Sequence, residues 1–353
     1  MNSPTKQSPQ RNIYAVIGFA RSGSSLITRG LKALGIELGN KLVDYEKTNR
    51  WNAKGFWEDK EIIFDIYVKT FAALEYGKRG ILLMDRDLQL SSKLDQMRNA
   101  ATQLLEERFS STNYYGFKNP NTSKLLPFWQ SIFSKMQLKE HYIITLRNPL
   151  ASAKSFSMLT ELDLEVCLLL WLMHTIPAIA ETHGRDRVVV SYELMMQDPR
   201  KQLERIKNQL KIPALADQKE IDIFANEFLD NKLNRHPISD DDLKNHPALS
   251  AAPLCLTVYQ LLYKVAQDEI SLESQEFADA WQAIMTELEK LYPVYQLLDK
   301  VLRQNKTLKR NIRQINKSFI WKLLYPLRFI DDKLRAIRVK NRSANKRVVT
   351  AYE

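Results

Sequence analysis

Short apolar runs alternate with longer amphipathic segments along most of the chain. In the longer segments the apolar residues recur at helical spacing, as at Leu26, Ile27, Leu31 and Leu34. Strands that alternate with helices are typical of a parallel sheet with helices on both faces. The sequence therefore predicts an α/β fold with four strands: IYAVI from Ile13, YYGFK from Tyr114, HYIITLR from His141 and DRVVVSYE from Asp186.

The length and the later pattern add a second region. A chain of 353 residues can hold one large α/β domain with an appendage. We assign the domain to residues 12–298 and a basic helical C-terminal extension to residues 299–353. Apolar residues recur at helical intervals through the extension and the segment before it, and we expect the helix to break at Pro293 and Pro326.

Positive charge is concentrated in the extension. The whole chain carries a formal charge of +11, and residues 300–353 alone hold 16 Lys and Arg against 3 Asp and Glu. This asymmetry argues against nucleic-acid binding by the body and places an anionic partner at the C-terminus. Trp321, Leu324 and Phe329 among cations suit peripheral contact with an anionic membrane. Packing on the body or on another subunit, as in a homo-oligomer, is the open alternative.

Cysteine and histidine usage points away from metal and disulfide chemistry. Only Cys167 and Cys255 are present, and the five histidines show no metal-ligand spacing, so the sequence predicts no metal. Such usage fits a reducing cytoplasm. No apolar segment precedes the first strand, and no apolar run reaches membrane-spanning length. We therefore expect a cytoplasmic protein that is peripheral on the inner face of the membrane.

The stretch GFARSGSS, which begins at Gly18, joins the first strand to the first helix. The first amides of a helix lack intrahelical partners, and the helix dipole is positive there, so this turn is suited to an oxyanion. Three serine hydroxyls and one guanidinium add donors. The predicted anion-binding residues are Arg21, Ser22, Gly23, Ser24 and Ser25.

The turn is P-loop-like but lacks the lysine of nucleoside-triphosphate loops. Gly18 and Gly23 keep the spacing of G-x-x-x-x-G-K-[ST], while Ser24 stands at the lysine position and the cation is Arg21. A kinase must neutralise a highly charged triphosphate, usually with a metal ion. A fixed guanidinium with several amides suits a less charged group, and a P-loop kinase is kept as an alternative.

Polar residues follow each predicted strand. Ligands of open parallel sheets lie beyond the carboxyl ends of the strands, so Arg21, Lys118, Arg147 and Tyr192 are expected to converge on one crevice. Ser155 follows Arg147 by eight residues, which is about two helical turns. A guanidinium and a hydroxyl placed in this way could bind a second phosphate.

These motifs together resemble the sulfotransferase family, which uses 3′-phosphoadenosine 5′-phosphosulfate (PAPS). ARSGSS is similar to the family's 5′-phosphosulfate loop, P-[KR]-S-G-[ST]-[ST], and Arg147 with Ser155 is similar to its 3′-phosphate motif. VVVSYELMMQDP extends the resemblance, which covers roughly residues 13–210. GFWED and GFKNPNTSKLLPFW look most like bacterial carbohydrate-type sulfotransferases.

The resemblance implies sulfuryl transfer from PAPS to a hydroxyl of a saccharide or lipid-linked glycan, with adenosine 3′,5′-bisphosphate as product. It also implies that Tyr192 contacts adenine and that Arg235, in NKLNRHP, lies in a loop that closes over the nucleotide. Two departures stand out: Ala20 replaces the usual proline, and FKNP lacks the histidine base of small-molecule sulfotransferases.

Catalytic roles follow as hypotheses. Preorganised cations stabilise developing charge on the leaving group, which assigns Arg21 and Lys118 to that role. Glu58 is the proposed general base for the acceptor hydroxyl, and the alternative is that it only stabilises the helix N-terminus that it adjoins. Two separated positive pockets would hold the two ends of the donor. Ala20 and the missing histidine also leave open a non-catalytic scaffold of a polysaccharide assembly complex.

Overall fold

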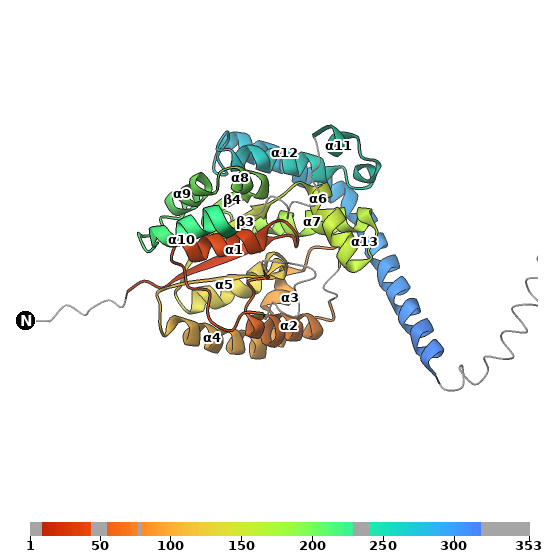
Figure 1. The fold of residues 1–353 in the computed structure, drawn as a ribbon. Helices are drawn as coiled ribbons and strands as arrows, with labels where there is room; N and C mark the ends of the chain where they lie inside the picture. The colour runs from red at the N-terminus through yellow and green to blue at the C-terminus, as the bar shows by residue number, and fades with distance from the viewer. Residues whose placement is uncertain (1–8, 44–54, 77–79, 229–239, 319–353) are drawn as a thin grey trace, which may run out of the picture. The chain divides into compact units, whose positions relative to one another are not determined.

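The computed structural model describes residues 9–43, 55–76, 80–228 and 240–318 (Figure 1). The chain divides into two units, Met1–Tyr292 and Pro293–Glu353. The first unit holds the whole sheet, and the described part of the second is helical. The predicted domain boundary after residue 298 stays a prediction.

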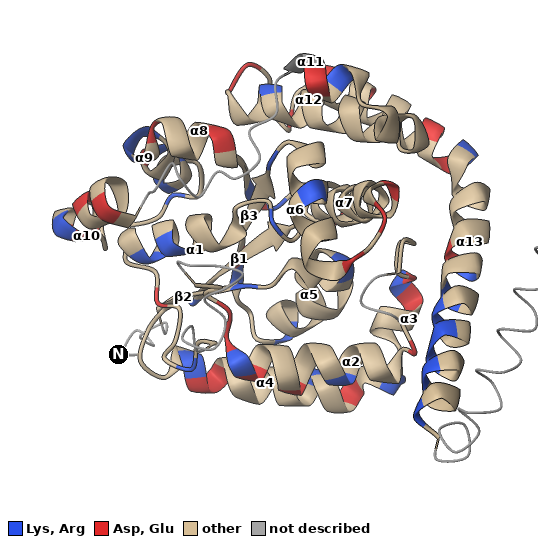
Figure 2. Cartoon of the chain, turned by 45° about the vertical axis from the view of Figure 1, so that its right-hand side comes forward, with Lys and Arg blue, Asp and Glu red and all other residues tan. Residues whose placement is uncertain are grey.

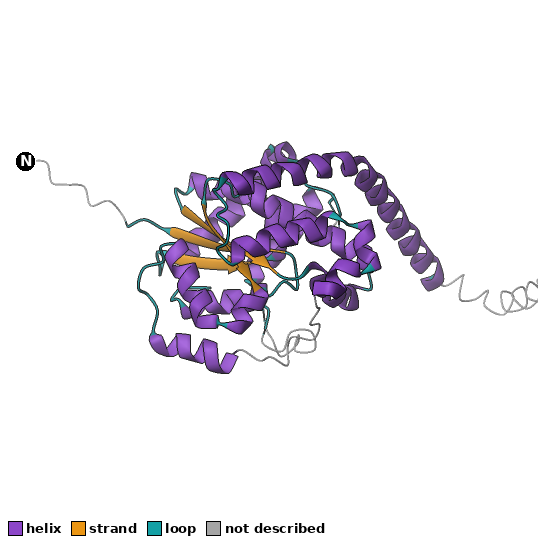
Figure 3. Ribbon diagram, turned by 90° about the horizontal axis from the view of Figure 1, so that it is seen from above, coloured by secondary structure: helices purple, strands orange, loops and turns teal. Residues whose placement is uncertain are grey.

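Four parallel strands form the sheet, in the order β2-β1-β3-β4 (Figure 3). They are β1 (Asn12–Gly18), β2 (Tyr114–Lys118), β3 (Lys139–Leu146) and β4 (Asp186–Ser191). Nearly all of their residues are buried, as in parallel sheets that are covered on both faces. The predicted α/β fold with a parallel sheet flanked by helices is confirmed.

Helices cover both faces of the sheet (Figure 1). On one face α1 (Ser24–Ala33) and α9 (Pro199–Gln209) bury Leu31 and Leu203 in a core shared with Val16 and Val190 of the strands. On the other face α5 (Leu126–Lys135) places Trp129 against Phe117 of β2, with ring centroids 5.1 Å apart. These apolar faces fix the helices over the sheet and leave its carboxyl edge to the loops.

The remaining helices complete the first unit. The α-helices are α2 (Val68–Ala73), α3 (Arg86–Leu90), α4 (Asp95–Phe109), α6 (Pro149–Thr160), α7 (Leu164–Ala180), α8 (Tyr192–Gln197), α10 (Gln218–Ile223), α11 (Asp240–Asn245) and α12 (Leu254–Ala266). Shorter 3-10 or π segments lie at η1 (Ile62–Tyr67), η2 (Ser92–Leu94), η3 (Pro120–Leu125), η4 (Phe224–Phe228) and η6 (Pro247–Ala251).

The last described helix, α13 (Gln275–Lys317), runs through Pro293 without a break. The expected break at Pro293 is therefore wrong. Pro293 is exposed, so water can satisfy the carbonyl that loses its intrahelical partner. Lys and Arg recur along the C-terminal part of α13 (Figure 2). Pro326 and the apolar residues proposed to meet a membrane, Trp321, Leu324 and Phe329, lie outside the described residues.

None of the described helices is by itself long and apolar enough to cross a membrane. The one pair that reaches the required length and composition together is α6 with α7, and their axes turn by 117° at the break.

Candidate functional site

The predicted polar residues gather at the carboxyl edge of the sheet. Lys118 is the last residue of β2, and Arg147 and Tyr192 directly follow β3 and β4. Lys118 is in register with Val16 on the neighbouring strand β1, two residues before Gly18 ends that strand. Because all four strands are parallel, their ends lie along one edge. The folding of the sheet alone therefore brings these residues to one side of the molecule.

The turn after β1 presents the positive end of α1. Arg21 has a φ of 70° and Gly23 a φ of 81°, so the turn contains two residues in the left-handed region. No side chain caps the N-terminus of α1, and the first intrahelical bond runs from the Ile27 amide to the Gly23 carbonyl over 3.1 Å. The amides of the first helical turn precede that bond and have no intrahelical partner. This end of the helix is suited to bind an oxyanion.

The serine hydroxyls of the turn help to hold its shape. Ser22 is fully buried, and its Oγ lies 3.4 Å from Oγ of Ser152 on α6. The Ser25 hydroxyl donates to the Phe56 carbonyl over 3.1 Å, and the Ser24 carbonyl accepts from Thr28 over 2.7 Å. The predicted role of the three hydroxyls as ligand donors stays a prediction.

Gly23, Tyr192 and Arg147 form a stack. A Cβ on Gly23 would lie 2.5 Å from Cδ2 of Tyr192, so glycine is required by close packing as well as by its φ. The Arg147 guanidinium lies over the Tyr192 ring, 4.3 Å from its centroid. Tyr192 thus supports Arg147 with one face of its ring. Contact between Tyr192 and adenine stays a prediction.

Direct hydrogen bonds join the two predicted anion-binding motifs. Nε of Arg21 donates to Oγ of Ser155 over 3.0 Å, and Nη1 of Arg147 donates to the Arg21 carbonyl over 3.1 Å. The turn after β1 and the start of α6 are therefore one cluster. Arg21 and Ser155 are in contact in this arrangement, and the expectation that two separate positive pockets hold the donor stays a prediction.

Burial makes the charge of Arg147 costly. Arg147 is only 7% exposed, and burial lowers the pKa of its guanidinium, while the nearby Tyr192 and Glu193 act in the opposite direction. An arginine side chain remains protonated in proteins, so the cost appears as a buried positive charge. An anion bound beside it would offset that cost, which makes Arg147 a strong candidate for an anion ligand.

The Glu58 carboxylate lies at the end of β2. Its Oε1 accepts from Nζ of Lys118 over 2.5 Å and its Oε2 accepts from Nδ2 of Asn119 over 3.1 Å. The Glu58 carbonyl accepts from the Val43 amide over 2.9 Å. An ionised carboxylate has about four lone-pair positions, so the bonds from Lys118 and Asn119 do not by themselves use all of them. Glu58 is therefore held in place and still able to accept a proton.

A buried ion pair fixes the residue next to Glu58. Asp59 is 3% exposed, and its Oδ2 lies 3.0 Å from Nε of Arg108 on α4. Its Oδ1 accepts from the amides of Glu61 and Ile62 over 2.9 and 3.3 Å. This pair fixes the backbone directly after Glu58. It therefore limits how far the Glu58 side chain can move.

Three supporting residues were not predicted. Asn119 holds Glu58, Ser123 accepts from the Gly18 amide over 2.8 Å, and Glu193 accepts from the Asn148 amide over 3.1 Å. The sequence offered a signal for two of them. Asn119 precedes a proline at a strand end, and Glu193 follows Tyr192 in the same segment as the predicted site. Nothing in the sequence pattern distinguished Ser123.

One predicted site residue lies outside the described part, and a histidine that was not predicted for the site is buried in α7. Arg235 falls in residues 229–239, which are not described. His174 is buried in α7, where Nδ1 lies 2.7 Å from the Leu170 carbonyl, and burial lowers its pKa well below the ordinary value. Over the described ranges no three His, Cys, Asp or Glu side chains are arranged to hold a metal ion.

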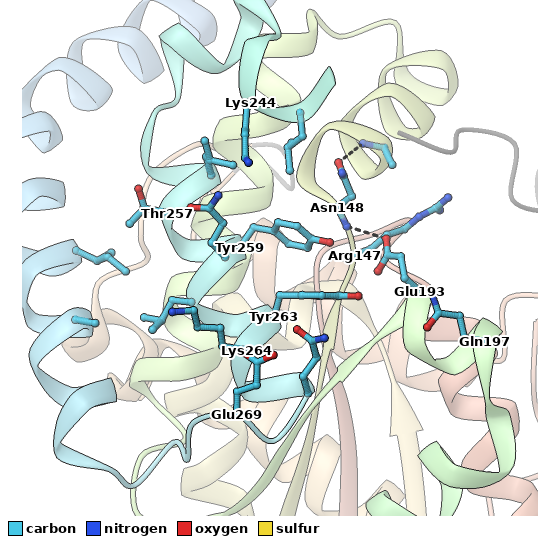
Figure 4. A pocket seen from close by; sticks show the side chains of 18 residues that line it. Arg147, Asn148, Glu193, Gln197, Lys244, Thr257, Tyr259, Tyr263, Lys264 and Glu269 are labelled. Carbon is cyan, nitrogen blue, oxygen red and sulfur yellow. Dashed lines mark hydrogen bonds between the residues drawn. The ribbon is translucent and has the colours of Figure 1, made fainter. Parts of the chain in front are cut away.

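A cavity of about 720 Å³ lies beside the cluster (Figure 4). Arg147, Asn148 and Glu193 line it on one side and Tyr259 and Tyr263 of α12 on the other. Its size is within the range of small-molecule sites. The cavity shares Arg147 with the cluster, but its lining includes none of the following residues: Arg21, Glu58, Lys118 and Ser155.

Comparisons with known proteins give limited similarity. No family model matches the sequence, and no curated protein matches it. The sulfotransferase domain of the Synechococcus PCC 7002 olefin synthase is similar at 19% identity, covers 72% of this chain and 97% of that chain, and has a TM-score of 0.39. A sulfotransferase domain from the curacin biosynthetic pathway has 16% identity, covers 80% and 99% of the two chains, and has a TM-score of 0.35. The functional argument therefore depends on the residues of the site.

Proposed function

We propose that this chain is a sulfotransferase that moves a sulfuryl group from PAPS to a hydroxyl of an acceptor. The observation that carries the proposal is the cluster at the N-terminus of α1, where Arg21 contacts Ser155 and Arg147 contacts the Arg21 carbonyl. The cluster combines an uncapped helix end with two guanidinium groups. A donor with two anionic groups on one nucleoside suits such an arrangement.

Each motif has a proposed part of the donor. The amides at the start of α1 and the Arg21 guanidinium would hold the 5′-phosphosulfate, and Arg147 with Ser155 would hold the 3′-phosphate. Bound PAPS supplies an activated sulfuryl group with a phosphate leaving group. Fixed donors near that phosphate would stabilise the negative charge that develops on it. With the donor bound, the Ser155 hydroxyl would bond to the 3′-phosphate, either in place of Arg21 or together with it.

The Glu58 carboxylate is the proposed general base. It would accept the proton of the acceptor hydroxyl as that oxygen forms its bond to sulfur. Lys118 and Asn119 hold the carboxylate at the strand end by the bonds given above. Lys118 would also add positive charge near the transferred group, in support of Arg21.

The proposed class of acceptor is based on the sequence motifs and not on the geometry of the site. A saccharide or lipid-linked glycan is proposed from the motif resemblance of GFWED and GFKNPNTSKLLPFW alone. Contact of residues 319–353 with an anionic membrane would place the protein near a lipid-linked acceptor, and this also stays a proposal.

Calorimetric titration tests the donor proposal. Adenosine 3′,5′-bisphosphate should bind more tightly than adenosine 5′-monophosphate, because only the former can engage Arg147 and Ser155 with a 3′-phosphate. ATP with magnesium should bind weakly, since Ser24 stands where a triphosphate loop has lysine. Tight ATP binding would favour a kinase. Binding of none of the three would favour a non-catalytic scaffold.

A pair of serine variants on α6 sharpens the titration. Ser155→Ala should weaken binding of the bisphosphate about tenfold and leave the monophosphate unchanged, the size expected for one hydrogen bond to a charged group. Ser157→Ala is the matched control, because the Ser157 hydroxyl donates to the Leu162 carbonyl over 2.6 Å and not to the turn. Equal effects of both variants on the bisphosphate would overturn the assignment of Ser155.

A further inference from the structure

One surface of α13 carries apolar side chains with a strict sequence repeat. Val294, Val301, Leu308 and Ile315 are spaced by seven residues, and Ile312 and Leu297 lie between them. These six side chains are between 44% and 64% exposed. At 3.6 residues per turn they fall within a sector of roughly 60°. Within Pro293–Lys317 the helix therefore presents a narrow apolar stripe to solvent.

The N-terminal half of the same helix behaves differently. Phe277, Ile284 and Leu288 are between 2% and 4% exposed, so the first half of α13 buries its apolar residues in the folded chain. The stripe from Val294 to Ile315 remains exposed in the single chain. Exposure of a continuous apolar stripe is unusual for a monomer and is typical of an interaction surface.

The repeat has the pattern of a two-stranded coiled coil. With Val294, Val301, Leu308 and Ile315 at the d positions, the a positions are Leu298, Asn305 and Ile312. Apart from Leu297 at a g position, the exposed side chains of the stripe lie at a and d, so the stripe is narrower than the apolar face of an ordinary surface helix. A single asparagine at an a position favours two parallel strands in one register.

The cations of this part of α13 lie outside the a and d positions, so they leave the seam open to a second helix. We infer that the stripe pairs with the same stripe of a second copy of this chain, in a parallel coiled coil. In that register the flanking contacts between the copies are Leu297 with Leu302, Gln304 with Lys309, and Asn311 with Asn316. None of these pairs brings like charges together. The other cations lie on the outer face, at Lys300, Arg303, Lys306, Arg310, Arg313 and Lys317.

Two double variants, with substitutions at neighbouring positions of α13, test the inference in the full-length chain. Leu308→Glu with Ile315→Glu places carboxylates in the seam, and Thr307→Glu with Gln314→Glu places the same charge one residue away on the outer face. Sedimentation velocity should show a dimer for the wild type and the Thr307/Gln314 variant. The Leu308/Ile315 variant should dimerise at least roughly 100-fold more weakly, because each copy would bury unpaired carboxylates.

Cysteine cross-linking tests the parallel register independently of stability. Val301→Cys should form a disulfide between two copies under mild oxidation, since equal d positions face each other, and Thr307→Cys should not. The native Cys167 and Cys255 are buried and give a low background. A wild type that is monomeric at all accessible concentrations would overturn the inference. So would a dimer that the Leu308/Ile315 variant leaves intact, or a monomer that uses this stripe to bind vesicles of anionic lipid.

Discussion

Two regions at the carboxyl ends of the strands hold positive charge in different ways: the lysine end lies at the outer strand β2, and the arginine end lies at the central strands β1 and β3. At β2 the Lys118 ammonium lies 2.5 Å from a Glu58 carboxylate oxygen, so the cation and its counter-ion are built in together. Beyond β1 and β3, the contacts of Arg21 and Arg147 include a hydroxyl, a backbone carbonyl and the face of a tyrosine ring. The first arrangement pairs one cation with one carboxylate, and the second brings two guanidinium groups together near the Glu193 carboxylate.

The difference indicates that the two regions have different roles in the proposed reaction. A carboxylate held by an ammonium and an amide is fixed in position and can exchange a proton with a substrate. Two guanidinium groups brought together at one helix N-terminus are suited to bind an anion. The comparison therefore predicts that substitutions at the arginine end affect donor binding and the stabilisation of its leaving group. Substitutions at the lysine end should affect the transfer step and leave donor binding nearly unchanged.

The largest effect is expected at the arginine end. Arg21→Ala should lower turnover about 1,000-fold, because a fixed cation near developing charge is lost. Arg147→Ala should chiefly weaken binding of adenosine 3′,5′-bisphosphate. Arg200→Ala is the control, since Arg200 forms an exposed pair with Asp222 over 2.6 Å away from the site. Steady-state kinetics with PAPS and calorimetry measure both effects, and near-normal turnover of Arg21→Ala would remove its assigned role.

A second prediction concerns the carboxylate end. Glu58→Gln should lower turnover about 100-fold or more, because glutamine has nearly the same shape and can still accept from Lys118 but cannot accept the proton. Binding of the bisphosphate should stay within about twofold, since Glu58 is not assigned to the donor. Glu165→Gln, at an exposed position in the first turn of α7, is the control. A Glu58→Gln protein with wild-type turnover would leave Glu58 as a residue that only stabilises the adjoining helix.

Gly23→Ala tests the support beneath Arg147. The added Cβ would meet Tyr192 at 2.5 Å and would sit on a residue with a φ of 81°. Gly184→Ala is a matched control because Gly184 has a φ of 72° and no atom within 4 Å of the added Cβ. Both variants should lose about 1–3 kcal/mol of unfolding free energy through backbone strain. Only Gly23→Ala should weaken bisphosphate binding, and equal binding by both would show that the stack is not needed.

The smallest expected effect is a pH dependence of the unfolding free energy at His141, which lies away from the site. It reflects the cost of burying an ionisable side chain. Burial lowers the pKa of His141 from its ordinary value of 6.5 to about 4. The unfolded chain therefore binds this proton more readily. The contribution of His141 to the unfolding free energy is fully present above the ordinary pKa of 6.5 and is lost as pH decreases. Unfolding free energy should drop by about 1 kcal/mol between about pH 7 and about pH 5.5.

The matched variant for this pH dependence is His141→Asn. It should flatten this part of the urea-denaturation profile, because asparagine does not titrate. A wild-type profile without this drop would contradict the effect assigned to burial of His141.

Much of the fold could be predicted because its signals are local. The strands from Ile13 and Asp186 are short apolar runs, and the helix after Gly23 follows a Gly/Ser turn. The break expected at Pro293 was wrong, because a local rule for proline does not include solvent access at that position. The strand-end rule predicted which residues share one edge of the sheet, but not which of them bond to one another. Arg21 and Ser155 are far apart in sequence, and only the packing of α6 beside the turn brings them together.

The sequence by itself determined which residues stand at strand ends, because strand order does not alter where each strand stops. It also determined the seven-residue repeat of α13, since helical spacing is a local property. Only the tertiary structure decided that Glu58 faces Lys118, that Arg147 lies on Tyr192 and that the α13 stripe is exposed. Those facts depend on the packing of distant segments against one another, and pairwise packing leaves no mark in the local order of apolar and polar residues.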